Sequence, residues 1–268
     1  MGAGEVFICA GGESMTRIPM SGFNPMPHPL LAESSCAYIG MGQTAENVAV
    51  KYGITRKEQE NFAVQSHAKA SAAQNAGKFK DEIVPVTLAD GSVVDKDGCI
   101  RAGTTADKLA ELKPAFDAKG TVTAGASSPL TDGAYAVLVA SEDYARAHNL
   151  QILARIKSIA VAGCLPEIMG IGPVVATQKA LKRAGLTTKD IDIIELNEAF
   201  ASQSLACIRD LGFGPDIAKI NIDGGALALG HPLGATGARI VGKAASLLKR
   251  ENKRYALATQ CIGGGQGI

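Results

Sequence analysis

The stretch IDIIELNEAFASQSLACIRDL, residues 191–211, places a short apolar strand, a polar break and a helix in succession. Ile191–Leu196 has the length and the branched apolar residues of a strand, and Glu198–Leu211 has a helical pattern. Strands and helices alternate around it in the same way, with a strand at 154–160, helices at 174–184 and 235–249, and a last strand at 255–260. This alternation predicts an α/β fold with helices on both faces of a layered sheet.

The first half of the chain departs from this pattern. Buried strands are expected at 5–10 and at 134–139, the latter before a helix around 142–148. Between them lies a mixed and polar region, residues 16–124, which we interpret as an inserted loop domain. Its expected elements are a helix at 44–53, a helix from a Thr55/Glu58 capping box to Gly77, a short strand at 83–86 and a turn at Asp90-Gly91.

The composition excludes several classes of protein. The chain has 268 residues, and its 27 Lys+Arg nearly balance its 26 Asp+Glu, so no basic surface for nucleic acid is expected. No apolar stretch approaches the roughly 18 residues that span a bilayer, and residues 1–12 carry no export signal. The 6 cysteines form no CxxC pair, which excludes a zinc ribbon and argues against a disulfide framework. We therefore expect no metal site, and a reducing compartment.

Three candidate sites each follow a predicted strand, at the edge where α/β sheets bind ligands. The first begins at Asn197, whose side-chain amide can orient a water molecule or an oxyanion. A purely structural role is the alternative, because asparagine is also a preferred N-cap of helices. Position alone leaves both roles open.

The second candidate is His231, which lies in the glycine-rich stretch GGALALGHPLGATG, residues 224–237. It stands between Gly230 and Pro232 just before a predicted helix, so a fixed backbone presents its imidazole with little bulk around it. The positive end of a helix favours nearby negative charge, such as a thiolate or an oxyanion. A lone histidine is more often structural or solvated, and this alternative stays open.

The third candidate is Cys261, at the start of CIGGGQG, residues 261–267. A thiol at the end of a strand and before consecutive glycines can be approached closely by a ligand. The glycine N–H groups are free to form an oxyanion hole. A buried structural cysteine is an equally good explanation of this motif alone.

Taken together and in order, these motifs closely resemble the thiolase family, especially the degradative 3-ketoacyl-CoA thiolases (acetyl-CoA acyltransferases). The resemblance covers essentially the whole chain. Its motifs are AGGESM at 10–15, MGQTAE at 41–46, GTVTAG at 120–125, DGA at 132–134, NEAF at 197–200, GHP at 230–232, and Cys261 with its glycines. Gly40 and the stretch 126–129 favour the degradative branch over the biosynthetic one.

The resemblance implies a thiolase-like layered α/β/α/β/α sandwich. Residues 1–15 and 125–150 would form a remnant of an incomplete N-terminal half. Residues 16–124 would form the loop (lid) domain. Residues 151–268 would form a nearly complete C-terminal half.

The implied reaction is thiolytic cleavage of a 3-ketoacyl-CoA by CoA, as in fatty acid β-oxidation, through an acylated cysteine. By the resemblance, His231 activates that cysteine and Asn197 holds a water that completes the oxyanion site. Cys261 moves the proton at the acetyl α-carbon, and the Gly263 N–H contributes to a second oxyanion hole. Coenzyme A is a substrate, and no cofactor is implied.

Three further residues match positions that contact CoA or line its tunnel in the family, namely Arg101, Ser128 and Phe200. Their structural explanations are, respectively, a solvated charge, a turn residue and a core aromatic. Family members are homodimers or homotetramers, and some join a β-oxidation multienzyme complex. The implied location is cytoplasmic, although an organellar address in an upstream segment would change it.

The family's nucleophilic cysteine belongs to an N-terminal segment upstream of the position that matches Met1, and none of the six cysteines here has a matching context. The family also continues past Ile268 into a final strand. We therefore expect the chain as written to be inactive. A non-catalytic module that binds CoA or a partner is the alternative, which the joint presence of His231, Asn197 and Cys261 disfavours. A ketoacyl synthase relative ranks lower, because those enzymes use two histidines.

Overall fold

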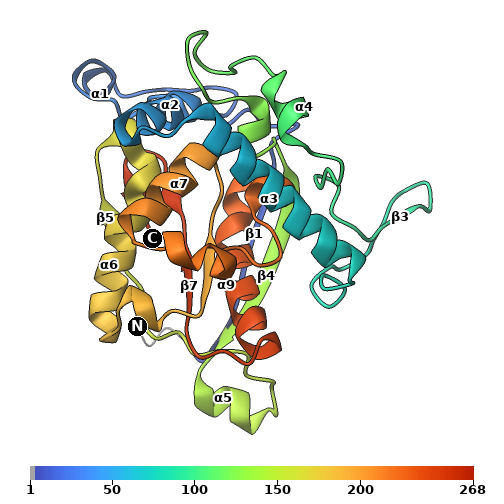
Figure 1. Ribbon diagram of the computed structural model, residues 1–268. Coiled ribbons are helices and arrows are strands. Elements are labelled where there is room, and N and C mark those ends of the chain that lie inside the picture. The colour runs from blue at the N-terminus through green and yellow to red at the C-terminus, as the bar shows by residue number, and fades with distance from the viewer. Residues whose placement is uncertain (1–3) are drawn as a thin grey trace.

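The computed structural model describes residues 4–268 (Figure 1). Its strands are β1 (Val6–Ser14), β2 (Val86–Thr87), β3 (Val93–Val94), β4 (Asp132–Ala140), β5 (Ala162–Gly163), β6 (Ile193–Leu196), β7 (Ala256–Thr259), β8 (Cys261–Ile262) and β9 (Gln266–Gly267). Its α-helices are α1 (Pro29–Ser34), α2 (Met41–Tyr52), α3 (Arg56–Asn75), α4 (Ala106–Ala110), α5 (Glu142–Ala147), α6 (Gly172–Ala184), α7 (Ala201–Asp210), α8 (Ala226–Leu229) and α9 (Leu233–Arg250).

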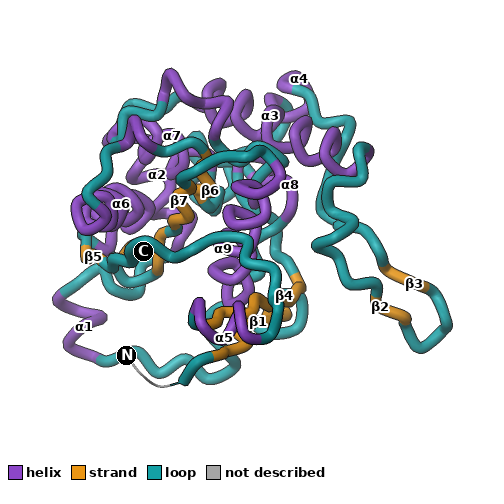
Figure 2. Tube along the Cα trace, turned by 90° about the horizontal axis from the view of Figure 1, so that it is seen from below, coloured by secondary structure: helices purple, strands orange, loops and turns teal. Residues whose placement is uncertain are grey.

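The long helix α9 lies at the centre of the molecule. On one side it contacts β1 and β4, which pair antiparallel over nine residues from Val6↔Ala140 to Ser14↔Asp132. On the other side it contacts β6 and β7, which pair parallel (Figure 2). A helix between two strand pairs must bury more than one face. Accordingly α9 buries Ile240, Ala244 and Leu247 together with polar side chains.

The strand β6 is the more deeply buried member of the β6–β7 pair. All four of its residues are buried, as expected for a parallel strand covered on both faces. Ile194 and Leu196 belong to the main hydrophobic cluster, which also includes Phe213 and Ile220. Helix α6 packs beside β7, and α7 packs against α6 (Figure 1).

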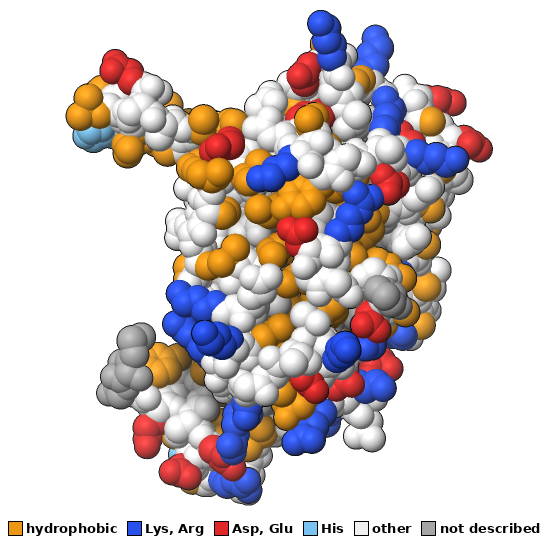
Figure 3. Space-filling view, turned by 60° about the vertical axis from the view of Figure 1, so that its left-hand side comes forward, with side chains coloured by type: hydrophobic (Ala, Val, Ile, Leu, Met, Phe, Trp, Pro, Cys, Tyr) orange, Lys and Arg blue, Asp and Glu red, His pale blue; other side chains and the backbone are white. Residues whose placement is uncertain are grey.

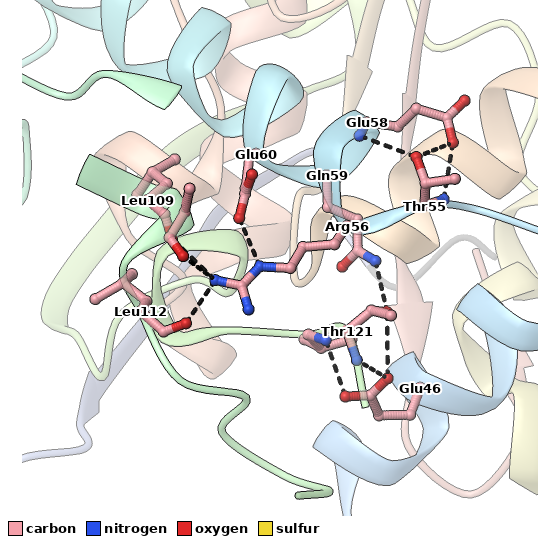
Figure 4. Close-up of polar contacts among 11 residues, drawn as sticks. Glu46, Thr55, Arg56, Glu58, Gln59, Glu60, Leu109, Leu112 and Thr121 are labelled. Carbon is pink, nitrogen blue, oxygen red and sulfur yellow. Dashed lines mark hydrogen bonds and ion pairs between the residues drawn. The ribbon is translucent and has the colours of Figure 1, made fainter. Parts of the chain in front are cut away.

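Polar contacts from helices α2 and α3 hold the irregular part of the 16–124 region in place (Figure 4). The buried carboxylate of Glu46 accepts hydrogen bonds from the backbone N–H groups of Thr121 and Val122, both at 2.9 Å. The Arg56 guanidinium donates to three carbonyl groups at the end of α4, including that of Leu109 at 3.1 Å. These bonds replace the regular ladder that this irregular stretch cannot form.

Most of the expected helices are present within one to three residues of the predicted bounds, but four strand predictions were wrong in whole or in part. The strand expected at 83–86 is displaced to β2, Val86–Thr87. The strand expected at 134–139 was to be buried, whereas the residues of β4 are exposed or half-buried. The strand at 5–10 was expected to be buried, whereas residues 6–10 are exposed and β1 continues through Gly11 and Gly12 to Ser14. No strand forms at 154–160, because no strand among the described residues pairs with this extended segment.

Apolar side chains are consequently exposed at both places, including Phe7 and Ile8 of β1 and Ile156 and Ile159 of the extended segment. Figure 3 shows one face of the molecule on which hydrophobic side chains appear between charged ones. Within residues 4–268, no helix is both long enough and apolar enough to cross a membrane.

The start of α3 provides a test of this fold's local energetics. Thr55 and Glu58 form a reciprocal capping box, in which the Glu58 carboxylate accepts from the Thr55 N–H at 2.8 Å. We expect Thr55→Ala to lower the free energy of unfolding by about 1 kcal/mol, because it leaves a helix N–H without its acceptor. Urea unfolding measures this change. Thr55→Ser, which keeps the hydroxyl, is the control; an equal loss in both variants would contradict the assignment.

Candidate active site

The edge of the β6–β7 strand pair brings two of the candidate sites together. In the parallel register Leu196 lies opposite Thr259, so Asn197 and Cys261 leave the sheet at the same edge. The Asn197 N–H donates to the Thr259 carbonyl at 3.0 Å, which extends the ladder by one residue. Helix α7 has its N-cap at Phe200 rather than Asn197, so the N-cap explanation of Asn197 was wrong. Its side chain is free for another role.

That side chain points at the second candidate, His231. The Asn197 amide nitrogen Nδ2 lies 3.4 Å from Nε2 of His231. The other ring nitrogen, Nδ1, lies 2.7 Å from the hydroxyl of Thr236 in the first turn of α9. Both contacts are satisfied when Nδ1 carries the proton and donates to Thr236 while Nε2 accepts from Asn197. The ring therefore presents a neutral Nε2 beside Asn197.

The backbone of His231 is fixed by a residue far away in sequence. Its N–H donates to the hydroxyl of Thr131 at 3.1 Å. The preceding Gly230 has a φ of 91°, and a Cβ there would lie 2.5 Å from the Thr131 side chain. Only glycine fits both the backbone conformation and this close approach. Thr131, just before β4, thus fixes the backbone of His231, whereas Thr236 contacts its ring.

Burial dominates the electrostatics of the site. It lowers the pKa of His231 from 6.5 to about 4, and the positive charge of Arg239 adds to the effect. Burial also raises the pKa of the Cys261 thiol to about 12. At neutral pH the imidazole is therefore unprotonated and the thiol is protonated. Neither group carries a charge before a ligand arrives.

Cys261 and the glycines after it form a tight hairpin. β8 pairs with β9, so Cys261 lies opposite Gly267, and the turn contains Gly264 and Gly265 with φ of 81° and 96°. Gly263 lies beside α2, where an added Cβ would be 4.0 Å from the Met41 sulfur. Gly263 is exposed.

A cysteine that could serve as nucleophile next to His231 is not found in the described part of the chain. None of the six cysteines there is hydrogen-bonded to the imidazole. Cys207 is fully buried and its thiol contacts the Gly170 carbonyl at 3.3 Å, so it is structural. Cys9 and Cys36 are exposed. The same residues contain no cluster of His, Cys, Asp and Glu suited to a metal ion.

The three predicted CoA-binding residues lie at different distances from this edge. Ser128 is close, because its N–H donates to the Ala199 carbonyl at 3.0 Å. Phe200 packs edge to face against Phe116 of the loop region, with ring centroids 5.8 Å apart. Arg101 is exposed farther along the loop region, and its N–H donates to the ring of His67. Only Ser128 and Phe200 adjoin the Asn197 segment directly.

Comparison with known proteins agrees with this arrangement. Residues 1–143 match the thiolase N-terminal domain, and residues 150–268 match the thiolase C-terminal domain. The chain belongs to the thiolase family.

Relatives in this family are similar over its whole length. The thiolase chain is 52% identical to a 3-ketoacyl-CoA thiolase of Vibrio cholerae and covers 71% of that protein. It is 48% identical to a 3-ketoacyl-CoA thiolase of Bacillus subtilis, of which it also covers 71%. A crystal structure of human mitochondrial 3-ketoacyl-CoA thiolase in complex with CoA superposes with a TM-score of 0.87 at 44% identity, over 99% of this chain and 70% of that one. The α/β fold of this chain is thus the thiolase fold.

Two residues of the site escaped the sequence interpretation of this thiolase, namely Thr131 and Thr236, which hold His231 from two sides. Thr236 had a usable signal, because it lies five residues after the histidine in the first turn of a predicted helix. Thr131 had none, since it lies 100 residues away in the chain. Contacts of that kind follow only from the fold.

The lowered pKa of His231 predicts a pH-dependent stability of this thiolase. The unfolded chain takes up a proton near pH 6.5, whereas the folded protein holds the imidazole neutral down to about 4. As pH falls through this window, protonation favours the unfolded state, and above it the effect vanishes. We expect His231→Gln to lose less stability than the wild type between pH 6.5 and 4.

Urea unfolding at a series of pH values measures the effect. The control is His148→Gln, which removes an exposed histidine at the C-cap of α5 and should follow the wild-type profile. Identical profiles for the wild type and His231→Gln would show that the buried imidazole is not the source.

Proposed function

We propose that this chain carries the acid–base half of a 3-ketoacyl-CoA thiolase, which cleaves a 3-ketoacyl-CoA with CoA to acetyl-CoA and a shortened acyl-CoA. The observation that carries the proposal is the contact between Asn197 and a neutral His231 at the sheet edge where Cys261 emerges. Binding alone requires no imidazole held against an amide at the edge where a thiol emerges. These groups together supply proton transfer and oxyanion binding.

Each residue has a role in this proposal. Nε2 of His231 accepts the proton of a nucleophilic thiol and then, with a water held by Asn197, stabilises the thioester oxyanion. Cys261, protonated at neutral pH, exchanges the proton at the α-carbon of the acetyl group. The Gly263 N–H stabilises the oxyanion formed there, and Arg101, Ser128 and Phe200 contact CoA.

The nucleophilic cysteine is proposed to come from outside these 268 residues, because no described cysteine is bonded to His231. The antiparallel β1–β4 pair supports assigning 1–15 and 125–150 to one thiolase half, 16–124 to the loop domain and 151–268 to the other half of a layered α/β/α/β/α sandwich. We further propose that the protein is a homo-oligomer and that it is cytoplasmic. The two exposed free thiols, Cys9 and Cys36, fit a reducing compartment.

Turnover of a medium-chain 3-ketoacyl-CoA with free CoA, followed by the appearance of acetyl-CoA, tests this function. We expect the 268-residue chain alone to be silent. The same chain fused behind the unmatched upstream segment of the Vibrio cholerae relative should turn over. In that fusion His231→Ala and Cys261→Ala should each lower kcat by about 100-fold or more.

Two outcomes would count against the proposal. Activity of the unfused chain that survives Cys261→Ala would show that another of its own cysteines is acylated, which mass spectrometry would locate. A folded fusion that binds CoA but never turns over, beside an active Vibrio cholerae enzyme, would favour the non-catalytic binding module.

A further inference from the structure

Glu198 is a fully buried carboxyl group directly after Asn197, with an exposed fraction of 2%. Its two oxygens accept three hydrogen bonds from three separate segments. The donors are the Ser66 hydroxyl on α3 at 2.6 Å, the Asn221 amide at 2.6 Å and the Leu227 N–H on α8 at 3.2 Å. A buried carboxyl with three donors is a structural hub, because each donor would otherwise be left unsatisfied.

Ser66 provides a second link between Glu198 and the segment that carries His231. Its hydroxyl donates to Glu198 and also accepts from the Gly225 N–H at 3.1 Å. The fit is tight, since a Cβ on Gly225 would lie 2.1 Å from the carboxyl carbon of Glu198. The loop-region helix α3 therefore contacts both Glu198 and the start of the 224–231 segment.

Asn221 connects the same carboxyl to the end of β6. Its amide nitrogen donates to the Leu196 carbonyl and to Glu198, and its amide oxygen accepts from the Leu196 N–H at 2.9 Å. The residue adopts a left-handed backbone with φ of 45° to do so. The residue before Asn197 is thus held from the side by the side chain that also reaches Glu198.

We propose that Glu198 is a positioning residue that sets the spacing between Asn197 and His231. It is covalently next to the first, and through Leu227 and Ser66–Gly225 it holds the short helix that leads into the second. The proposal rests on the proposed function only in giving that spacing its purpose. Because α3 belongs to the 16–124 region, it also makes this region part of the support of the acid–base site.

A carboxylate suits this position better than its amide isostere. All three partners donate hydrogen bonds, and a glutamine would turn an NH₂ group towards one of them. Burial raises the pKa of Glu198, while the hydrogen bonds of Ser66 and Asn221 and the charge of Lys69 oppose the rise. Replacement by glutamine should therefore weaken the hydrogen bonds that connect the Asn197 and His231 segments.

The titration of His231, followed by NMR of histidine-labelled protein, reports whether the Asn197 and His231 segments are still held together. It requires no enzymatic turnover. The His231→Gln variant identifies its signal among the four histidines. In the wild type we expect the ring to stay neutral to about pH 4. In Glu198→Gln, water gains access to the ring, and the midpoint should rise by about one pH unit or more towards the ordinary value.

Glu46→Gln is the matched control. Glu46 on α2 is also buried and accepts two backbone N–H groups, from Thr121 and Val122 (Figure 4). Neither donor belongs to the histidine segment. It should lower stability while leaving the His231 midpoint unchanged. The proposal fails if Glu198→Gln lowers stability with the midpoint unmoved, or if both variants move it equally.

If Glu198→Gln does not fold, a milder pair decides the question. Ser66→Ala removes the hydroxyl that joins Glu198 to Gly225 and should raise the midpoint in the same direction. Ser204→Ala removes a buried hydroxyl on α7 that has no partner among the described residues and should leave it in place. An unmoved midpoint in Ser66→Ala would overturn the proposal. Since no step requires catalysis, failure here is distinct from failure of the thiolase assay.

Discussion

The parallel pairing of β6 with β7 is the constraint on which the rest of the structure depends. Parallel strands end at a common edge, so the register that sets Leu196 opposite Thr259 also brings Asn197 close to Cys261. A slip of one residue would turn Ile194 and Leu196 out of the hydrophobic cluster and move Asn197 to the other face. The same strand register is therefore required both for the packing of the core and for the geometry of the site.

Helix α9, which packs on this strand pair, is also held in place by charges. Asp223, with no exposed surface, accepts from Lys243 at 2.7 Å and from Arg250 at 2.5 Å, both on α9. Burial alone would raise the pKa of Asp223, but these two partners lower it to about 2. Lys243 also pairs with Glu82 of the 16–124 region at 2.8 Å. Removing one partner from such a buried group would leave an uncompensated charge, which is strongly destabilising.

The sequence was sufficient for most of the helices but not for the contacts between the elements. Periodicity and caps located α3, α6 and α9, and the motifs selected His231, Asn197 and Cys261. The failed strand at 154–160 shows the limit, because apolar periodicity does not supply the neighbour that a strand needs. Likewise Thr131 and Ser66 carry no local signal; each acquires its role from a partner 100 or more residues away.

The resting charges of the site suggest how its chemistry depends on assembly. An imidazole with a pKa near 4 is a weak base at neutral pH, and it would not hold a thiol in the ionised form on its own. A negative charge brought next to it, such as a thiolate or an oxyanion, favours the protonated ring and raises that pKa. Under the proposed function, burial keeps His231 neutral until the nucleophile and the thioester are both in place. Proton transfer would then be coupled to completion of the site, and the segments that hold the ring would determine when it happens.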